Sequence, residues 1–256
     1  MLIDAHAHCR GPLEGDDPWA QDRLFVEAMD AVGIDIAVVS NLSTPRPATP
    51  EGFQKCNRDM LSALKEFRGR FWGYAYVNSG YTKEALADIE RCLEADEDCI
   101  GVKLYNEYFI SDPVVRPVIE KCIELDVPIL QHAGHSQVNT SSQPFISDGG
   151  HVTKVSREYP EAKIICGHLG GGGDWEWAIK ALRDSSPSVG ADTSGSVTDE
   201  GLIEYAIEVM GADRLYFACD MSVTAGAGKF MSAKMSDDDR GKIASGNFLR
   251  LVGREA

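Results

Sequence analysis

The 256-residue sequence has no long apolar run, no excess of basic residues and no clustered pattern of cysteines. No stretch approaches the roughly 18 apolar residues that a transmembrane helix requires. Polar Asp4 and His6 stand where a secretory signal needs apolar residues. The net charge of −15 argues against binding to nucleic acid or to an anionic membrane surface. Seven scattered cysteines argue against a disulfide framework, so we expect a cytoplasmic protein.

The sequence also lacks any linker, charge run or composition break that would mark a second domain. Short apolar runs alternate with amphipathic segments from end to end. The runs are Leu2–His8, Ile34–Asn41, Phe71–Asn78, Cys99–Asn106, Pro128–Gly134, Lys163–Gly170, Ser188–Gly195 and Leu215–Ser222. Continuous apolar strands joined by helical crossovers are typical of parallel sheets that are covered on both faces. Eight such units predict one domain over 1–256, a (β/α)₈ TIM barrel, with a doubly wound open sheet as the alternative.

The expected helices lie between these runs. They are Trp19–Val32, Phe53–Phe67, Lys83–Ala95, Pro113–Leu125, Gly150–Tyr159, Trp175–Leu182, Asp199–Met210 and Ser236–Leu251. Three longer segments without a clear pattern follow a strand, namely Thr44–Gly52, His135–Asp148 and Val223–Met235. In a barrel such loops form the active-site face.

Two histidines close the first predicted strand. His6 and His8 are two residues apart, and alternate residues of a strand point to the same face. Both imidazoles should therefore project into the barrel, where a pair of histidines suits a divalent metal. Taken alone, the pair is also compatible with two hydrogen-bonded polar residues.

Three further apolar runs each have an ionisable residue near their end. His132 stands at the end of the fifth strand, His168 at the end of the sixth and Asp220 at the end of the eighth. Burying that many polar groups costs several kcal/mol unless something pairs them. A metal ion would pair them.

Lys103 interrupts the fourth apolar run in its C-terminal half. A buried lysine needs a partner or a shifted pKa. It could hold a substrate carboxylate or, if carbamylated, could bridge a second metal together with His168. An ion pair with Glu107 or with a carboxylate of a neighbouring strand is the structural alternative.

The sequence resembles the amidohydrolase superfamily, and within it the family-2 metal-dependent hydrolases, which include aminocarboxymuconate-semialdehyde-type decarboxylases. The matching segments follow one another along nearly the whole chain. They are Ile3–His8, Asn57–Leu61, Arg70–Ala75, Gly101–Leu104, Gln131–Gly134, Tyr159–Gly171, Asp192–Gly195, Asp213–Asp220 and Ile243–Leu251. Met221 and Ser222 depart from the aromatic-Pro pair that follows the aspartate in many relatives, which leaves the substrate open.

The resemblance implies a metal site and assigns its ligands. His6, His8, His132 and Asp220 would hold one metal, with zinc favoured and manganese or iron as alternatives. His168 would lie beside it as a catalytic or second-metal residue. Three nitrogens, one carboxylate and an open position for water suit a catalytic site.

The favoured reaction is hydrolysis of a small, anionic amide, lactone or ester. The metal would activate water, and Asp220 would accept the proton of that water. His168 would stabilise the developing oxyanion. Arg10, Arg46 and Tyr105 are the predicted substrate-binding residues.

The alternative reaction is non-hydrolytic decarboxylation or hydration of an unsaturated or aromatic carboxylic acid, with nearly the same residues. The expected partner is a small molecule, and homo-oligomer formation is left open.

Overall fold

The computed structural model describes residues 1–136, 143–169 and 171–255. The predicted irregular segment His135–Asp148 therefore lies partly outside the described residues. None of the helices in these ranges combines the length and the low charge that a membrane crossing demands.

Eight parallel strands form a nearly closed barrel, and each pairs with the next along the chain. The strands are β1 (Ile3–His8), β2 (Ile36–Ser40), β3 (Phe71–Tyr76), β4 (Cys99–Leu104), β5 (Ile129–Gln131), β6 (Ile164–Cys166), β7 (Val189–Asp192) and β8 (Leu215–Tyr216). Backbone bonds from Ala5 to Phe217 and from Asp220 to His6 join the end of β8 to β1. This topology confirms the predicted (β/α)₈ barrel and excludes the open sheet.

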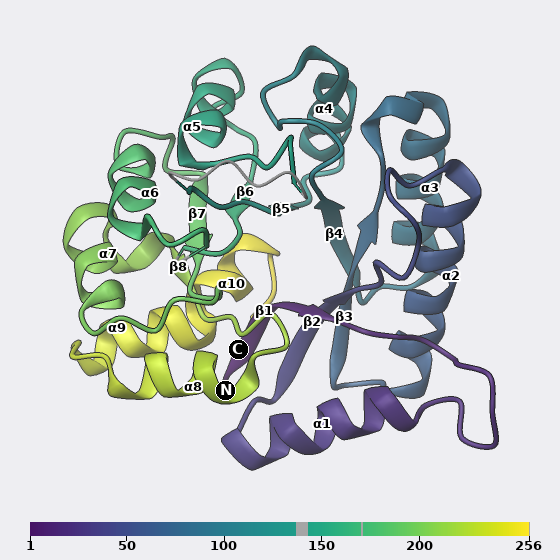
Figure 1. Cartoon of the computed structure of the whole chain (residues 1–256), viewed down its shortest axis with the longest axis horizontal. Coiled ribbons are helices and arrows are strands. Elements are labelled where there is room, and N and C mark those ends of the chain that lie inside the picture. The colour runs from purple at the N-terminus through teal and green to yellow at the C-terminus, as the bar shows by residue number, and fades with distance from the viewer. Residues whose placement is uncertain (137–142, 170, 256) are drawn as a thin grey trace.

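Helices surround the ring of strands (Figure 1). They are α1 (Ala20–Val32), α2 (Pro50–Glu66), α3 (Thr82–Ala95), α4 (Arg116–Glu124), α5 (Gly149–Glu158), α6 (Trp175–Leu182), α7 (Leu202–Met210), α8 (Val223–Ser232), α9 (Asp237–Gly241) and α10 (Asn247–Leu251). One hydrophobic cluster fills the barrel, and a larger one lies between strands and helices. The continuous apolar runs of the sequence reflect this double burial of the strands.

The prediction of an irregular segment over Val223–Met235 is wrong, because most of it forms α8. Gly226 and Gly228 weaken the helical pattern in the sequence, since glycine has low helix propensity. The structure needs a glycine at position 226, where a Cβ atom would lie 2.6 Å from the Cys219 sulfur. Val223, Ala227 and Phe230 are buried and anchor the helix through packing.

A β-bulge in β1 sets the direction of the histidine pair. Asp4 pairs with Ala37 and Ala7 pairs with Val39, so β1 has one extra residue between these pairs. A bulge of this kind re-aims a side chain. His6 and His8 both point into the barrel as predicted, whereas Asp4 accepts hydrogen bonds from the backbone of His6 and Cys219.

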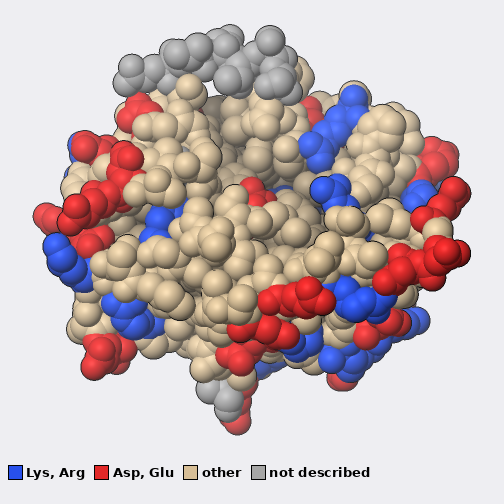
Figure 2. Space-filling view, turned by 60° about the horizontal axis from the view of Figure 1, so that its bottom comes forward, with Lys and Arg blue, Asp and Glu red and all other residues tan. Residues whose placement is uncertain are grey.

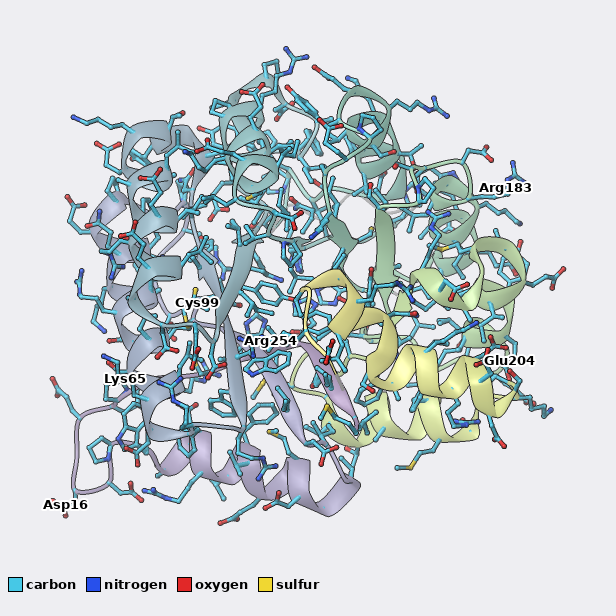
Figure 3. The ribbon with its side chains drawn as sticks, turned by 180° about the vertical axis from the view of Figure 1, so that it is seen from behind. Asp16, Lys65, Cys99, Arg183, Glu204 and Arg254 are labelled. Carbon is cyan, nitrogen blue, oxygen red and sulfur yellow. The ribbon has the colours of Figure 1, made fainter. Side chains whose placement is uncertain are left out.

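The C-terminal segment packs against the end of the barrel at which the strands begin, seen from behind in Figure 3. The Arg254 guanidinium lies over the Trp72 ring at 4.2 Å from the ring centroid. Its Nη1 atom also lies 3.1 Å from a carboxylate oxygen of Asp98. Phe248 fills the interior of the barrel beside Trp72 at this end.

Asn57 connects α2 to the barrel. Its side-chain amide donates to the Tyr76 carbonyl and to Asp88, and its oxygen accepts from the Tyr76 N–H. Asn57→Ala removes these partners from the buried Tyr76 backbone groups and leaves Asp88 with its contact to Arg91. We therefore expect the free energy of unfolding to fall by about 3 kcal/mol. Urea unfolding with an unchanged m-value would measure it. The exposed neighbour Arg58 provides the control, because Arg58→Ala should change stability by less than about 0.5 kcal/mol, and equal losses would contradict this role.

Candidate metal centre

Three predicted ligands meet at the C-terminal end of the barrel. The Nε2 atom of His8 lies 3.0 Å from an Asp220 carboxylate oxygen, and the Nε2 atom of His6 lies 3.7 Å from that oxygen. The ligand atoms of all three residues lie within 4.8 Å of one another. Because zinc bonds to nitrogen and oxygen are about 2.0–2.2 Å long, two ligands of one ion stand roughly 3–4 Å apart. The spacing therefore fits one divalent ion.

Lys103 lies in the same cluster and is fully buried. Its ammonium nitrogen is 2.7 Å from His6 Nε2. Burial lowers the pKa of Lys103 to about 8, although Asp220 and Asp192 favour the charged form. Of the two structural alternatives, the structure does not have the pair with Glu107, which accepts a hydrogen bond from the Tyr76 hydroxyl. The carboxylates that act on Lys103 are those of Asp220 and Asp192, which follow or end other strands of the barrel.

His132 and His168 contact each other, with His132 Nδ1 2.9 Å from His168 Nε2. The other nitrogen of His132 faces the side-chain oxygen of Gln143 at 3.3 Å. Burial holds the pKa of His132 well below its usual value and lowers that of His168 to about 4, so both rings are neutral near pH 7. The structure thus brings His132 beside the cluster of His6, His8 and Asp220, in contact with His168.

Asp192 and Ser194 are site residues that the sequence reasoning did not single out. Asp192 ends β7 and is fully buried, with one carboxylate oxygen 2.8 Å from His6 Nδ1. The Ser194 hydroxyl lies 2.9 Å from His168 Nδ1. A carboxylate behind a metal-binding histidine orients the ring and raises its basicity. The signal was present in the sequence, because Asp192 ends an apolar run just as Asp220 does.

Backbone strain coincides with the site. His168 and Asp220 both have positive φ angles, 62° and 46°, and Met221 follows at 64°. Such angles are uncommon outside glycine and cost about 1–3 kcal/mol where the surroundings impose them. The strain at His168 and Asp220 is therefore offset by the contacts that hold these two side chains at the centre.

A cavity of about 350 Å³ opens directly onto the cluster. Its lining includes His8, Asp220, Arg10, Arg46 and Tyr105, so the three predicted substrate-binding residues do lie at one pocket. The Arg46 guanidinium lies 3.6 Å from the centroid of the Tyr105 ring, and this ring stacks on His132 at 4.2 Å. Figure 2 shows one face hollowed near its centre, with acidic and basic side chains interspersed across that face.

The donor set fits a divalent metal. Buried neutral imidazoles and an ionised carboxylate are the usual ligands of zinc, manganese and iron. Burial would raise the pKa of Asp220, but the hydrogen bond with His8 and the nearby His6 and His168 hold it well below its usual range. Asp220 is thus available as an anionic ligand.

A second group of metal-compatible side chains consists of His6, His168 and Asp192. The hydrogen bonds from His6, Ser194 and the His168 backbone already occupy both oxygens of Asp192. Among the described residues, the cluster around Asp220 is therefore the better candidate for an ion.

The fold is shared with solved enzymes at low sequence identity. A 2,6-dihydroxybenzoate decarboxylase from Rhizobium is 16% identical, with a TM-score of 0.74 and 98% of each chain covered. A dihydroxybenzoic acid decarboxylase from Polaromonas, with bound manganese and the inhibitor 2-nitroresorcinol, is 18% identical. Its TM-score is 0.76, with 98% of this chain and 96% of that chain covered.

A 4-oxalomesaconate hydratase from Rhodopseudomonas palustris is also 18% identical, with a TM-score of 0.74 and with 99% and 96% of the two chains covered. At these identities the likeness establishes the fold. No curated protein matches the sequence.

The sequence itself matches a family over nearly its full length. The amidohydrolase family model aligns with residues 3–254, a range that includes every strand and all of the predicted site residues. This confirms the resemblance inferred from the ordered motifs. The chain belongs to the amidohydrolase family.

Proposed function

We propose that this protein is a metal-dependent decarboxylase of a small aromatic or unsaturated carboxylic acid. The observation that carries the proposal is the pocket, where two arginines and a stacked tyrosine lie beside a metal-compatible cluster. The compared structures include two decarboxylases of dihydroxybenzoic acids and a hydratase. Hydrolysis, the reaction favoured from the sequence, has less support than this alternative.

Each proposed role follows from the position of a side chain. His6, His8, His132 and Asp220 would hold one metal, and zinc or manganese fits these ligands. Such an ion would supply Lewis acidity that withdraws electron density from the bound acid. Arg10 and Arg46 would bind the anionic substrate.

The proton balance of the reaction points to Asp220. Decarboxylation breaks the bond to the carboxyl carbon, CO₂ leaves, and the electron pair that stays on the substrate carbon takes up a proton. Asp220 lines the pocket, and 30% of its side chain is exposed. Because its low pKa keeps it ionised, it would first accept a proton from the substrate or water and then deliver it to carbon.

His168 and Lys103 complete the proposed site. His168 is neutral and lies against His132, where it would orient that ring and stabilise negative charge that develops on the substrate. Lys103 contacts His6 directly. We therefore assign Lys103 to the site of the first metal, and not to a carbamylated bridge to a second metal.

The direct test is release of CO₂ from carboxyl-labelled acids. The protein would be loaded with zinc or manganese and incubated with 2,6-dihydroxybenzoate and related hydroxybenzoates. We expect labelled CO₂ and, in D₂O, one deuterium on the carbon that lost the carboxyl group. Hydrolysis of esters, lactones or amides without CO₂ from any acid would overturn the proposal in favour of hydrolysis, and hydration of 4-oxalomesaconate alone would favour a hydratase.

Arg46 gives a prediction about binding. Arg46→Met keeps an unbranched side chain close in size to the aliphatic part of arginine but removes the charged guanidinium, and a charge-assisted hydrogen bond contributes about 1.5–3 kcal/mol. We expect KM for the acid to rise about 10–100-fold, with little change in kcat. Arg183→Met is the matched control, because Arg183 is exposed beside Asp184 on the outer surface (Figure 3). A fall in kcat at unchanged KM would assign Arg46 to the chemical step instead.

A further inference from the structure

The Tyr105 ring lies between two planar groups at the edge of the pocket. The Arg46 guanidinium carbon is 3.6 Å from the centroid of this ring. The His132 imidazole stacks on the same ring, with a centroid distance of 4.2 Å and an angle of 22° between the planes. Since non-bonded carbon atoms stand about 3.5–4.0 Å apart, Arg46 and His132 would overlap if both lay on one face of the ring. They therefore cover opposite faces of Tyr105.

The backbone holds Tyr105 and His132 side by side. Tyr105 directly follows β4 and His132 directly follows β5, and these two strands pair up to Leu104 and Gln131. Gln131 is fully buried, and its side-chain nitrogen donates to the carbonyl oxygens of Tyr105 and His132, at 3.1 and 2.7 Å. Such an amide nitrogen has two hydrogens, one for each carbonyl. The stacked rings thus rest on a fixed backbone.

The covered faces exclude one role for Tyr105. An aromatic acid could stack on this ring only if one face were free, and Arg46 and His132 occupy both faces. Tyr105 is half-buried and lines the pocket. The part of the ring that borders the pocket is therefore its edge.

Arg46 gains a fixed plane from the contact with Tyr105. A guanidinium carbon at 3.6 Å from the ring centroid is too close for an edge-on approach, in which an N–H group would stand between the two. The guanidinium therefore lies flat on the ring. In this arrangement its N–H groups point sideways, parallel to the ring, and the contact with the ring face uses none of them.

This orientation suits a bound carboxylate. Arg46 is exposed and lines the same pocket as Arg10 and Asp220. A guanidinium binds a carboxylate through its edge, often by two parallel hydrogen bonds in its own plane. Arg46 also contacts the Tyr76 hydroxyl, and most of its five N–H groups remain for a ligand. The plane of Tyr105 thereby sets the plane in which a carboxyl group would be bound.

We propose that Tyr105 is a positioning residue: one face of its ring fixes the guanidinium plane of Arg46 for the substrate carboxylate, and the other face supports the His132 ring. The substrate then contacts the edge of Arg46 and not the faces of Tyr105. The inference rests on the proposed binding of an acid at Arg46 and on the proposed metal role of His132. One side chain thus connects the binding of substrate with the binding of metal.

Removal of the ring should loosen both neighbours. In Tyr105→Leu the guanidinium of Arg46 must be ordered anew whenever an acid binds, and we expect KM to rise about 3–10-fold with little change in kcat. His132 loses its stacking partner, so zinc affinity should fall about 3–10-fold. Competition with a coloured chelator measures the zinc affinity.

A double-mutant cycle separates positioning from direct contact. If Tyr105 acts through Arg46, the double variant Arg46→Met, Tyr105→Leu should have the KM of Arg46→Met alone, because both substitutions remove the same interaction. If the substrate stacked on Tyr105, the two increases in KM would multiply. A multiplied increase would overturn the proposal.

Proton NMR of the arginine N–H groups tests the stack without a substrate. Protons held over an aromatic face resonate upfield, so the Arg46 signals, assigned with Arg46→Met, should lie upfield in the wild type and in Tyr105→Phe. In Tyr105→Leu they should move to the range of the exposed Arg183. Arg254 lies over the Trp72 ring and should keep its signals in every variant.

Tyr205→Leu is the matched control. Tyr205 is also half-buried beneath a cation, with the Lys180 ammonium nitrogen 5.7 Å from its ring centroid, but it belongs to α7 and lies outside the lining of the pocket. The variant should keep the Arg46 signals, the zinc affinity and the KM of the wild type. An equal loss in Tyr205→Leu would overturn a specific role for Tyr105.

Addition of 2,6-dihydroxybenzoate to the zinc-loaded wild type tests the stack with an acid present. The Arg46 signals should stay upfield, whereas a move downfield would mean that the acid has displaced Arg46 from the ring and would overturn the proposal. So would wild-type Arg46 signals in the range of exposed arginines, or unchanged signals in Tyr105→Leu.

If Tyr105→Leu does not fold, the spectra of the wild type and of Tyr105→Phe still decide. The spectra and the zinc affinity need no turnover. A protein with this stack but without decarboxylation would therefore contradict the proposed reaction alone.

Discussion

Purified without chelator, the protein should contain about one divalent metal per chain, and the His6→Ala, His8→Ala double variant should contain almost none. Both ligand nitrogens would be lost, and the ion would retain only Asp220 and His132. Since removal of a mere outer partner weakens metal binding about 10–100-fold, loss of two ligands should exceed 100-fold. Elemental mass spectrometry of the two proteins measures the difference directly.

The same variant should abolish release of CO₂ and lose the stabilisation that bound metal provides. A ligand present at about 1,000 times its Kd stabilises the folded state by about 4 kcal/mol, so zinc should raise the Tm of the wild type and not of the double variant. His151→Gln is the control, because His151 belongs to α5 and contacts Asp148 outside the centre. It should keep both the metal and the Tm shift.

Two outcomes would contradict a centre with one metal. About two ions per chain would show that Lys103 and His168 take part in a second site. No metal, even after zinc or manganese is added, would mean that the cluster of His6, His8 and Asp220 is held by hydrogen bonds alone and would remove the basis of the proposed reaction.

Much of the barrel could be predicted because its strands are buried on both faces. The eight apolar runs all contain the observed strands, and the predicted helix Trp175–Leu182 has the observed bounds. The failures occur where local preference and packing disagree. The glycines of α8 weaken its helical pattern, yet the close approach to Cys219 requires one of them. Predicted helix Ser236–Leu251 is interrupted by a π-helical segment, Lys242–Gly246.

The site shows a similar division. Residues at strand ends could be found, since a polar side chain that closes an apolar run is visible in the sequence. The partnership between Asp192 and the histidines could not, because it joins the end of β7 to the His6 ring on β1 and to the backbone N–H of His168 just after β6. The bulge that re-aims β1 leaves no mark in an alternating pattern, although the direction of His6 and His8 was predicted correctly.

Asp220→Asn should retain the metal and lose most of the activity. The amide keeps an oxygen in the position that lies near His6 and His8, so binding of the ion survives in weakened form. The amide cannot accept and deliver a proton, and loss of a general acid–base group typically costs 10²–10⁴-fold in rate. We therefore expect kcat for decarboxylation to fall about 1,000-fold.

The backbone conformation at position 220 suits asparagine as well as aspartate. Asp220 has a φ angle of 46°, and asparagine tolerates the left-handed region about as well as aspartate does. The fold should therefore be unchanged, and the loss of rate can be assigned to the loss of proton transfer by this side chain. Asp220→Ala, in contrast, removes the ligand as well and should lower metal content and kcat together.

Asp213 supplies the control, because Asp213→Asn changes the same functional group on an exposed residue whose side chain lies 3.4 Å from Lys242. Its kcat should equal that of the wild type. If Asp220→Asn released CO₂ at the wild-type rate with its metal in place, the proton would have to come from another group at the pocket. His168 would then be the first to test, because its buried ring lies beside the cluster and contacts His132.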